Sequence, residues 1–112
     1  MRFKTDTEAV ILAVLEAGPR HGYGIAKVIR SESDGLLKLG EGQLYPLLRT
    51  MEEAGWVIGE WDPSAGEQPR RIYSLSDEGS AELARRAQGW HAFVNAVDRF
   101  FPPKAKVSEV SR

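Results

Sequence analysis

Four side chains that can hydrogen bond to nucleic acid lie close together in the chain, at Gln43, Tyr45, Arg49 and Thr50. Arginine presents a planar fork of donors that matches O6 and N7 of guanine, and glutamine can pair in the same two-point manner with N6 and N7 of adenine. A phenol and a hydroxyl are better suited to phosphate oxygens, which fix position without reporting base sequence. These residue types indicate a surface that fits a DNA groove, although an ordinary solvated helix face stays open as the alternative.

A short amphipathic helix is expected to position these side chains. Its apolar stripe has the i, i+3, i+4, i+7 spacing of a helix that packs on one side, and consists of Leu44, Leu47, Leu48 and Met51. At about 100° per residue, the four polar side chains fall on the opposite face or its flanks. We expect Pro46 to fall in the first turn, where its missing N–H costs nothing, and Gly55 to end the helix in a left-handed conformation.

Composition indicates one globular domain: the 112 residues are 42% apolar and 28% charged. The chain has no cysteine, which excludes disulfides and thiolate metal sites, and we expect no metal and no cofactor. No apolar run approaches the roughly 18 residues of a membrane-spanning helix, and the N-terminus lacks an apolar signal region. We therefore expect no membrane association and a cytoplasmic location.

Overall charge does not favour nucleic acid, because the formal net charge is −1 and the pI is about 6.1. The local balance differs. Between positions 20 and 50 the basic residues Arg20, Lys27, Arg30, Lys38 and Arg49 outnumber the acidic residues Glu32, Asp34 and Glu41. Additional candidates for contacts to the DNA backbone in this region are Lys27, Lys38, His21 and Tyr23, although a tyrosine here is also typical of a protein core and a histidine beside glycine can simply fix a turn.

The N-terminal half reads as three helices. Thr5 and Glu8 have the spacing of a capping box for a first helix that extends to Ala17. Residues 20–24 look turn-like and lead into a second helix through Ile29. Residues 31–40 are expected to form a loop with three leucines turned inward, at positions 36, 37 and 39.

The C-terminal half changes period. Residues 56–61 and 70–75 read as two strands joined by a long turn, and Ser76 is a good N-cap for a helix over residues 77–101. The expected fold is mainly α with a small β-hairpin: a winged helix-turn-helix plus a C-terminal dimerisation helix. We expect a winged unit at residues 1–76, the dimerisation helix at 77–101 and a flexible tail at 102–112.

The last helix carries a coiled-coil type of seam, in which apolar residues alternate by four and three: Leu83, Ala87, Trp90, Val94, Val97 and Phe101. About 25 residues at 1.5 Å each make a rod of about 37 Å, long enough to extend past a small winged core. The seam therefore predicts a homodimer joined along this helix, with packing against the chain's own core as the alternative.

Three motifs together resemble the PadR-like transcriptional regulators of the short type. They are residues 21–25 (HGYGI), residues 42–55, which begin GQLYPLL and end MEEAG, and residues 70–79 (RRIYSLSDEG). The resemblance covers nearly the whole chain up to about Phe101. Two departures concern the DNA contacts and not the class: Gln43 stands where the family usually has Thr or Ser, and residues 67–71 (EQPRR) replace a Gly-Arg-Pro-Arg-like run.

This resemblance implies a dimeric repressor that binds a two-fold symmetric double-stranded DNA operator. The helix with Gln43 and Arg49 would then lie in the major groove, while Arg70 and Arg71 at the base of the hairpin can reach the flanking minor groove or its phosphates. Members of the family are often released from DNA by aromatic or otherwise hydrophobic small molecules. An effector of that kind could fit between facing dimer helices, in a possible pocket formed by Trp90, Phe93 and Val94.

Two other classes of protein remain for comparison. A winged-helix module that binds protein and not DNA is the alternative that the acidic pI permits. An enzyme is disfavoured, because the two histidines are far apart, cysteine is absent, and residues 22–24 lack the preceding strand that a dinucleotide-binding glycine motif needs.

Overall fold

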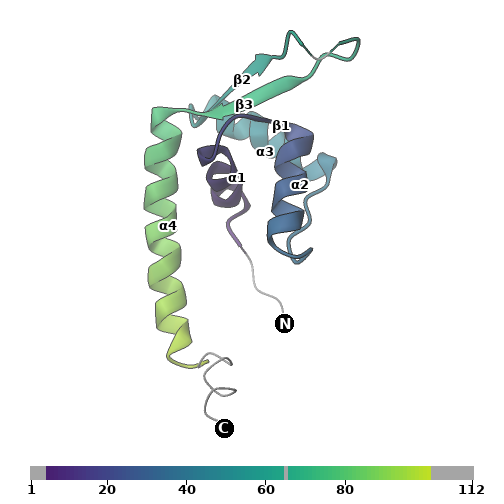
Figure 1. The fold of residues 1–112 in the computed structure, drawn as a ribbon. Coiled ribbons are helices and arrows are strands. Elements are labelled where there is room, and N and C mark those ends of the chain that lie inside the picture. Colours follow the sequence, from purple (N-terminus) through teal and green to yellow (C-terminus); the bar gives the residue numbers. More distant parts are fainter. Residues whose placement is uncertain (1–4, 65, 102–112) are drawn as a thin grey trace.

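Four helices and a three-stranded antiparallel sheet make up residues 5–64 and 66–101, which the computed structural model describes. In chain order the elements are α1 (Thr7–Glu16), β1 (Arg20–His21), α2 (Gly22–Glu32), α3 (Glu41–Glu53), β2 (Val57–Trp61), β3 (Arg71–Leu75) and α4 (Asp77–Asp98). Figure 1 shows α1, α2 and α3 gathered below the sheet, the β2–β3 hairpin projecting to one side, and α4 extending well past this head. The expected class, mainly α with a winged helix-turn-helix, is confirmed.

The sheet differs from the expected two-stranded hairpin, because β1 adds a third strand and the order is β1-β3-β2. Arg20 pairs with Tyr73 and His21 with Ile72. The turn-like reading of residues 20–24 was therefore wrong: two residues are strand and α2 begins directly at Gly22. A two-residue strand is too short to show alternation, so its pairing with β3 is a tertiary effect that local sequence does not reveal.

The core is built from the apolar faces of the first three helices with contributions from the sheet. The stripe predicted for α3 is confirmed, since Leu44, Leu48 and Met51 are all 0% exposed and Leu47 packs against the core from its edge. Pro46, however, is not in the first turn: α3 begins at Glu41, so the proline lies one turn further in and leaves the Gly42 carbonyl without its usual intrahelical donor. Gly42 is exposed, so that carbonyl lies where solvent can satisfy it.

Two further details of the head correct the expectations. The N-cap of α1 is Asp6 and not Thr5, with its Oδ1 atom accepting a hydrogen bond of 3.0 Å from the N–H of Ala9. Helix α2 runs to Glu32, two residues into the expected loop. In that loop Leu37 and Leu39 pack against the core as expected, but Leu36 is 86% exposed.

The start of α4 belongs to the head. Ser76 is the N-cap as predicted, with Oγ accepting from the N–H of Gly79 at 3.0 Å. Gly79 packs so tightly on the backbone carbonyl of Trp56 that a Cβ atom would overlap it. Four residues on, Leu83 joins the core at 8% exposure. The junction thus fixes the direction in which α4 leaves the sheet.

Beyond the head, α4 has little to pack against. The helix ends at Asp98, with Arg99 as C-cap, three residues before the expected end at Phe101. The expected tail at residues 102–112 lies outside the described residues. None of the helices in the described ranges is both long enough and apolar enough to cross a membrane.

Candidate nucleic-acid interface

The outer face of α3 carries the candidate base-reading residues. Arg49 and Thr50 are both exposed there, opposite the buried stripe. The Thr50 hydroxyl donates to the Pro46 carbonyl oxygen at 3.1 Å, and Gln43 Oε1 accepts from the Gly40 N–H at 3.3 Å. Both side chains therefore hold local backbone bonds, whereas Arg49 forms no ion pair within the described part of the chain. Of the predicted base-reading pair, Arg49 has its donor fork directed to solvent.

Tyr45 connects α3 to the beginning of α2. A Cβ atom at Gly22 would lie 2.7 Å from the Tyr45 hydroxyl oxygen, so the phenol rests directly on the glycine backbone. Only a residue without a side chain allows this approach, which explains Gly22 in the HGYGI motif. The hydroxyl consequently lies at the N-terminal end of α2, where unpaired backbone N–H groups favour anions.

A cleft of about 310 Å³ opens between the N-terminal end of α2, α3 and the hairpin. The structure brings five of the predicted site residues to its walls: His21, Tyr23, Tyr45, Arg70 and Arg71. Arg70 is exposed, as a phosphate-binding residue should be. These residues are separated by up to 50 positions in sequence, so the shared cleft is a product of the fold.

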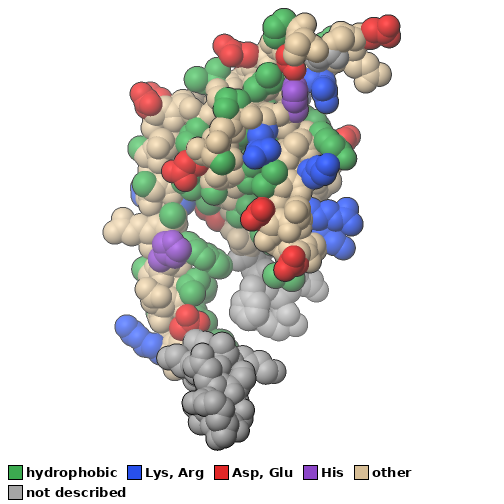
Figure 2. Space-filling view, viewed as in Figure 1, with side chains coloured by type: hydrophobic (Ala, Val, Ile, Leu, Met, Phe, Trp, Pro, Cys, Tyr) green, Lys and Arg blue, Asp and Glu red, His purple; other side chains and the backbone are tan. Residues whose placement is uncertain are grey.

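Lys27 and Lys38 lie together along a second groove of about 320 Å³ beside α2. Arg30 lines the same groove and was missed as a candidate contact. The signal was present, because Tyr23, Lys27 and Arg30 have the i, i+4, i+7 spacing of one helix face. Figure 2 shows Lys and Arg side chains gathered along the side of the head formed by α2.

Arg71 lines the cleft with the other predicted site residues, but its guanidinium is also engaged within the protein. Nη2 donates to Glu52 Oε2 at 2.7 Å and to the Gly59 carbonyl oxygen. The side chain is 34% exposed and lies over the rings of Trp61 and Tyr73, with its Cζ atom 5.6 and 5.9 Å from the ring centroids. Its Nη2 atom therefore already has two acceptors within the protein, and its role as a DNA contact stays a prediction.

His21 is also engaged. Its Nε2 atom lies 2.7 Å from Oδ2 of Asp62, which connects β1 to the start of the hairpin loop. The pKa of Asp62 is lowered to about 2, chiefly because the hydroxyl and N–H of Ser64 donate to the carboxylate, with His21 contributing less. A contact between His21 and phosphate would therefore compete with a strong carboxylate acceptor.

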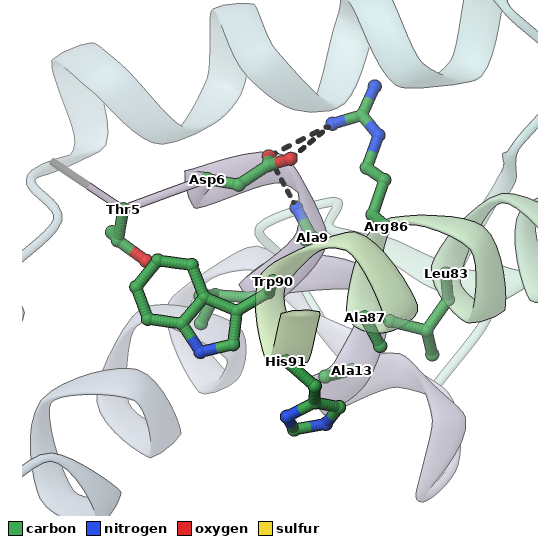
Figure 3. Close-up of a pocket in the computed structure, with 10 residues that line it drawn as sticks. Thr5, Asp6, Ala9, Ala13, Leu83, Arg86, Ala87, Trp90 and His91 are labelled. Atoms are coloured by element: carbon green, nitrogen blue, oxygen red, sulfur yellow. Dashed lines mark hydrogen bonds and ion pairs between the residues drawn. The ribbon is translucent and has the colours of Figure 1, made fainter. Parts of the chain in front are cut away.

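The seam of α4 changes character along its length. Leu83 is buried and Ala87, Val94 and Val97 are half-buried, whereas Trp90 is 43% and Phe101 63% exposed. Figure 3 shows Ala87, Trp90 and His91 of α4 facing residues of α1 and the segment before it across a groove of about 270 Å³. Of the three predicted effector-pocket residues, Trp90 lines this groove, while Phe93 and Val94 do not.

Comparison with known proteins places the chain in a family. The description "Transcriptional regulator PadR-like family" matches residues 11–85. A protein named as a probable transcriptional regulator of Mycobacterium tuberculosis is 30% identical over 77 residues, which are 69% of this chain and 40% of that protein. The chain thus spans less than half the length of that curated relative.

Solved structures agree with this match. A transcriptional regulator from Clostridium thermocellum superposes with a TM-score of 0.75 at 25% identity, covering 83% of this chain and 90% of that one. A PadR family regulator from Clostridium difficile gives a TM-score of 0.70 at 29% identity, covering 86% and 97%. Members of this family are transcriptional regulators and not enzymes. The chain belongs to the PadR-like family of transcriptional regulators.

Proposed function

We propose that two copies of this chain bind a two-fold symmetric DNA operator and repress transcription from it. The observation that carries this proposal is that the exposed face of α3 lies beside two clefts with basic linings, the groove of α2 with Lys27, Arg30 and Lys38 and the cleft with Arg70. A helix in the major groove is positioned by phosphate contacts from its surroundings. The chain has suitable side chains in both clefts.

Within this proposal α3 lies in the major groove and Arg49 contacts a base edge. Guanine is its natural partner because O6 and N7 match the two-donor fork. Gln43 would read adenine only after releasing the Gly40 N–H, a long bond of 3.3 Å that costs little to exchange. Tyr45 and Thr50 then contact phosphates, since each presents one hydroxyl beside the base-reading face.

Contacts with the DNA backbone come from the two clefts beside α3. On the α2 side these are Lys27, Lys38, Tyr23 and the additional residue Arg30, which share one groove. On the hairpin side Arg70 reaches the flanking minor groove or its phosphates, and His21 lies in the same cleft. This local set of cations offsets the net charge of −1 and makes binding sensitive to salt.

The second copy is joined through the distal half of α4. Its seam from Ala87 to Phe101 is apolar and incompletely covered by the rest of the described chain. A matching helix from a partner would bury both seams at once, because a two-fold interface uses the same patch twice. Two heads joined in this way would meet operator halves about 34–36 Å apart, one turn of DNA.

Substitutions of Arg49 and Arg70 test this division of labour on an operator selected from random DNA. Arg49→Ala should cost ~1–3 kcal/mol of binding free energy and relax the preference at one base position. Arg70→Ala should weaken binding to all sequences alike and lower the slope of log affinity against log salt by about 0.9 for each phosphate lost. Mutants that bind as the wild type does, or a wild type that selects no sequence, would favour a winged-helix module that binds protein.

A hydrophobic small molecule is proposed as the effector, and the groove between α1 and α4 supports this. Ala9, Val10, Ala13, Ala87 and Trp90 give it an apolar lining next to the half of α4 that joins the dimer. A ligand there would change DNA affinity only if it bound one arrangement of the heads more tightly than the other. Trp90 fluorescence, titrated alongside operator binding, measures both effects. A Trp90→Ala protein that responds normally to a ligand would argue against this site.

Because the proposed target is DNA, the protein is proposed to work in the cytoplasm.

A further inference from the structure

Arg71 connects three elements of the head through one side chain. It is the first residue of β3, directly after the hairpin loop, and its Nη2 atom bonds to Glu52 in the last turn of α3 at 2.7 Å. The same nitrogen donates to the carbonyl oxygen of Gly59 in β2. The guanidinium therefore joins the last turn of α3, the helix proposed to read bases, to both strands of the hairpin.

The surroundings of the guanidinium are shaped to hold it. A Cβ atom on Gly59 would lie 2.6 Å from Arg71 Nη2, so glycine leaves the space that the side chain fills. Trp61 and Tyr73 supply ring faces on which the cation lies. Burial raises the pKa of the Tyr73 phenol, which is neutral at ordinary pH even without this shift.

Two of the three nitrogens of the Arg71 guanidinium are occupied or enclosed within the protein. Nε is buried and has no hydrogen-bond partner among the described residues. Nη2 is shared between the carboxylate and the carbonyl. In contrast, the adjacent Arg70 is exposed on the cleft. Arg70 and Arg71 are consecutive residues but have different environments. Successive side chains of an extended chain point to opposite sides, which accounts for the difference.

We propose that the Arg71–Glu52 pair is a clamp that sets the position of the hairpin relative to α3, so that both reach DNA together. Arg71 is then a positioning residue, and the phosphate contact on this side is made by Arg70. The clamp rests on the proposed DNA binding. Its physical basis is that a charged, partly buried guanidinium shared between two acceptors ties the strands near the hairpin loop to α3, in addition to the strand pairing of the sheet.

The sharpest test is whether Glu52→Gln raises or lowers the affinity for the operator. This substitution removes a negative charge near the DNA, so electrostatics alone predicts tighter binding. Loss of the clamp predicts the opposite, a drop of about tenfold in operator affinity for one weakened charged hydrogen bond. Glu60→Gln is the matched control, since Glu60 is exposed on the same hairpin and alternates away from the side of Gly59. It should leave affinity unchanged or slightly raised.

Arg71→Lys separates positioning from direct contact. Lysine keeps the charge but loses the fork and the stacking. We expect affinity to fall about tenfold, the salt slope to stay at the wild-type value, and hydroxyl-radical protection to weaken at the flanks of the operator while the centre stays protected. The double variant Glu52→Gln/Arg71→Lys should bind as weakly as either single variant, because both break the same bond.

Free protein provides the readout that does not depend on DNA. Amide hydrogen exchange of β2 should accelerate in both single variants while α1 stays protected, and thermal unfolding followed by circular dichroism checks that the head is folded. The clamp is refuted if Glu52→Gln tightens binding as Glu60→Gln does, or if Arg71→Ala lowers the salt slope as Arg70→Ala does. A wild type that binds no duplex would instead end the proposed function, and exchange in β2 would still decide whether the pair fixes the hairpin.

Discussion

The two halves of α4 have opposite surroundings within one continuous helix. In the first half Leu83 enters the core. Arg86 bonds to the carboxylates of Asp6, Glu8 and Glu82, and its Cζ atom lies 4.8 Å from the ring centroid of Trp56. In the distal part four aromatic side chains are between 43% and 79% exposed: Trp90 and Phe93 in the second half of α4, and Phe100 and Phe101 just after its end. The first half therefore stabilises the head, while the second half has apolar surface that the described chain does not cover.

Exposed aromatic residues on this scale need an explanation. A Trp or Phe buries ~150–250 Å² in a core, which is worth several kcal/mol at ~25 cal/mol per Å². Figure 2 shows hydrophobic side chains along the distal half of α4, on the side facing α1. Contiguous apolar patches of this kind on small proteins usually mark an interface. A second α4 is the cover that symmetry makes available.

Val94→Asp should have the largest effect, because it places a charge in the middle of the distal seam. We expect monomers at micromolar concentration and a loss of operator affinity of more than about 100-fold, since one head contributes only half of the contacts. Analytical ultracentrifugation and a gel shift measure the two losses. The head should keep its own fold, because Val94 is not part of its core.

Ala92→Asp is the matched control for this prediction. Ala92 is exposed on the opposite side of the same turn, so the variant introduces the same charge into the same helix. It should remain dimeric and bind the operator normally. Dissociation of both variants to the same extent would mean that the seam is not the interface.

Leu48→Ala tests the other side of the comparison, the covered core of the head. Leu48 is 0% exposed beneath the α3 face, and its truncation should lower the free energy of unfolding by about 2–5 kcal/mol. Chemical denaturation gives the value. Leu36→Ala is the control, since this leucine is 86% exposed and should change stability by less than about 0.5 kcal/mol. Equal losses at both positions would contradict the assignment of the core.

The smallest expected effect concerns pH and is confined to the head. The pKa of Asp62 is lowered from 3.8 to about 2 by the hydrogen bonds of Ser64 and then His21. A lowered folded-state pKa means that the stabilisation is complete above 3.8 and is lost as pH falls through about 2. Carboxyl NMR of Asp62 should show this low midpoint, and Ser64→Ala should raise it. An unchanged midpoint in the variant would show that the Ser64 hydroxyl is not the cause, since the backbone N–H of residue 64 still donates in the variant.

Patterns with several repeats were predictable from sequence. The buried face of α3, the Ser76 cap and the two hairpin strands follow from helical spacing, capping chemistry and alternation, which are local properties. Features that depend on pairing at a distance were not. The strand β1 has only two residues, and its register with β3 comes from the fold.

The site residues show the same limit. Sequence placed Arg70 and Arg71 together as DNA contacts, yet the two side chains differ because Glu52 and Gly59 lie next to only one of them. Leu36, expected inside, is 86% exposed, whereas Leu37 and Leu39 from the same loop pack against the core. Partners that lie far apart in sequence decide these cases, and no spacing rule reports them.

The central claim is that this protein works as two heads joined by the distal halves of α4. Sedimentation of the wild-type protein, alone and with its selected operator, tests it most directly. The claim predicts a mass of twice 12.4 kDa without DNA and two chains on each duplex with it. A single chain of 12.4 kDa at micromolar concentration, or one chain bound to each operator with full affinity, would contradict it.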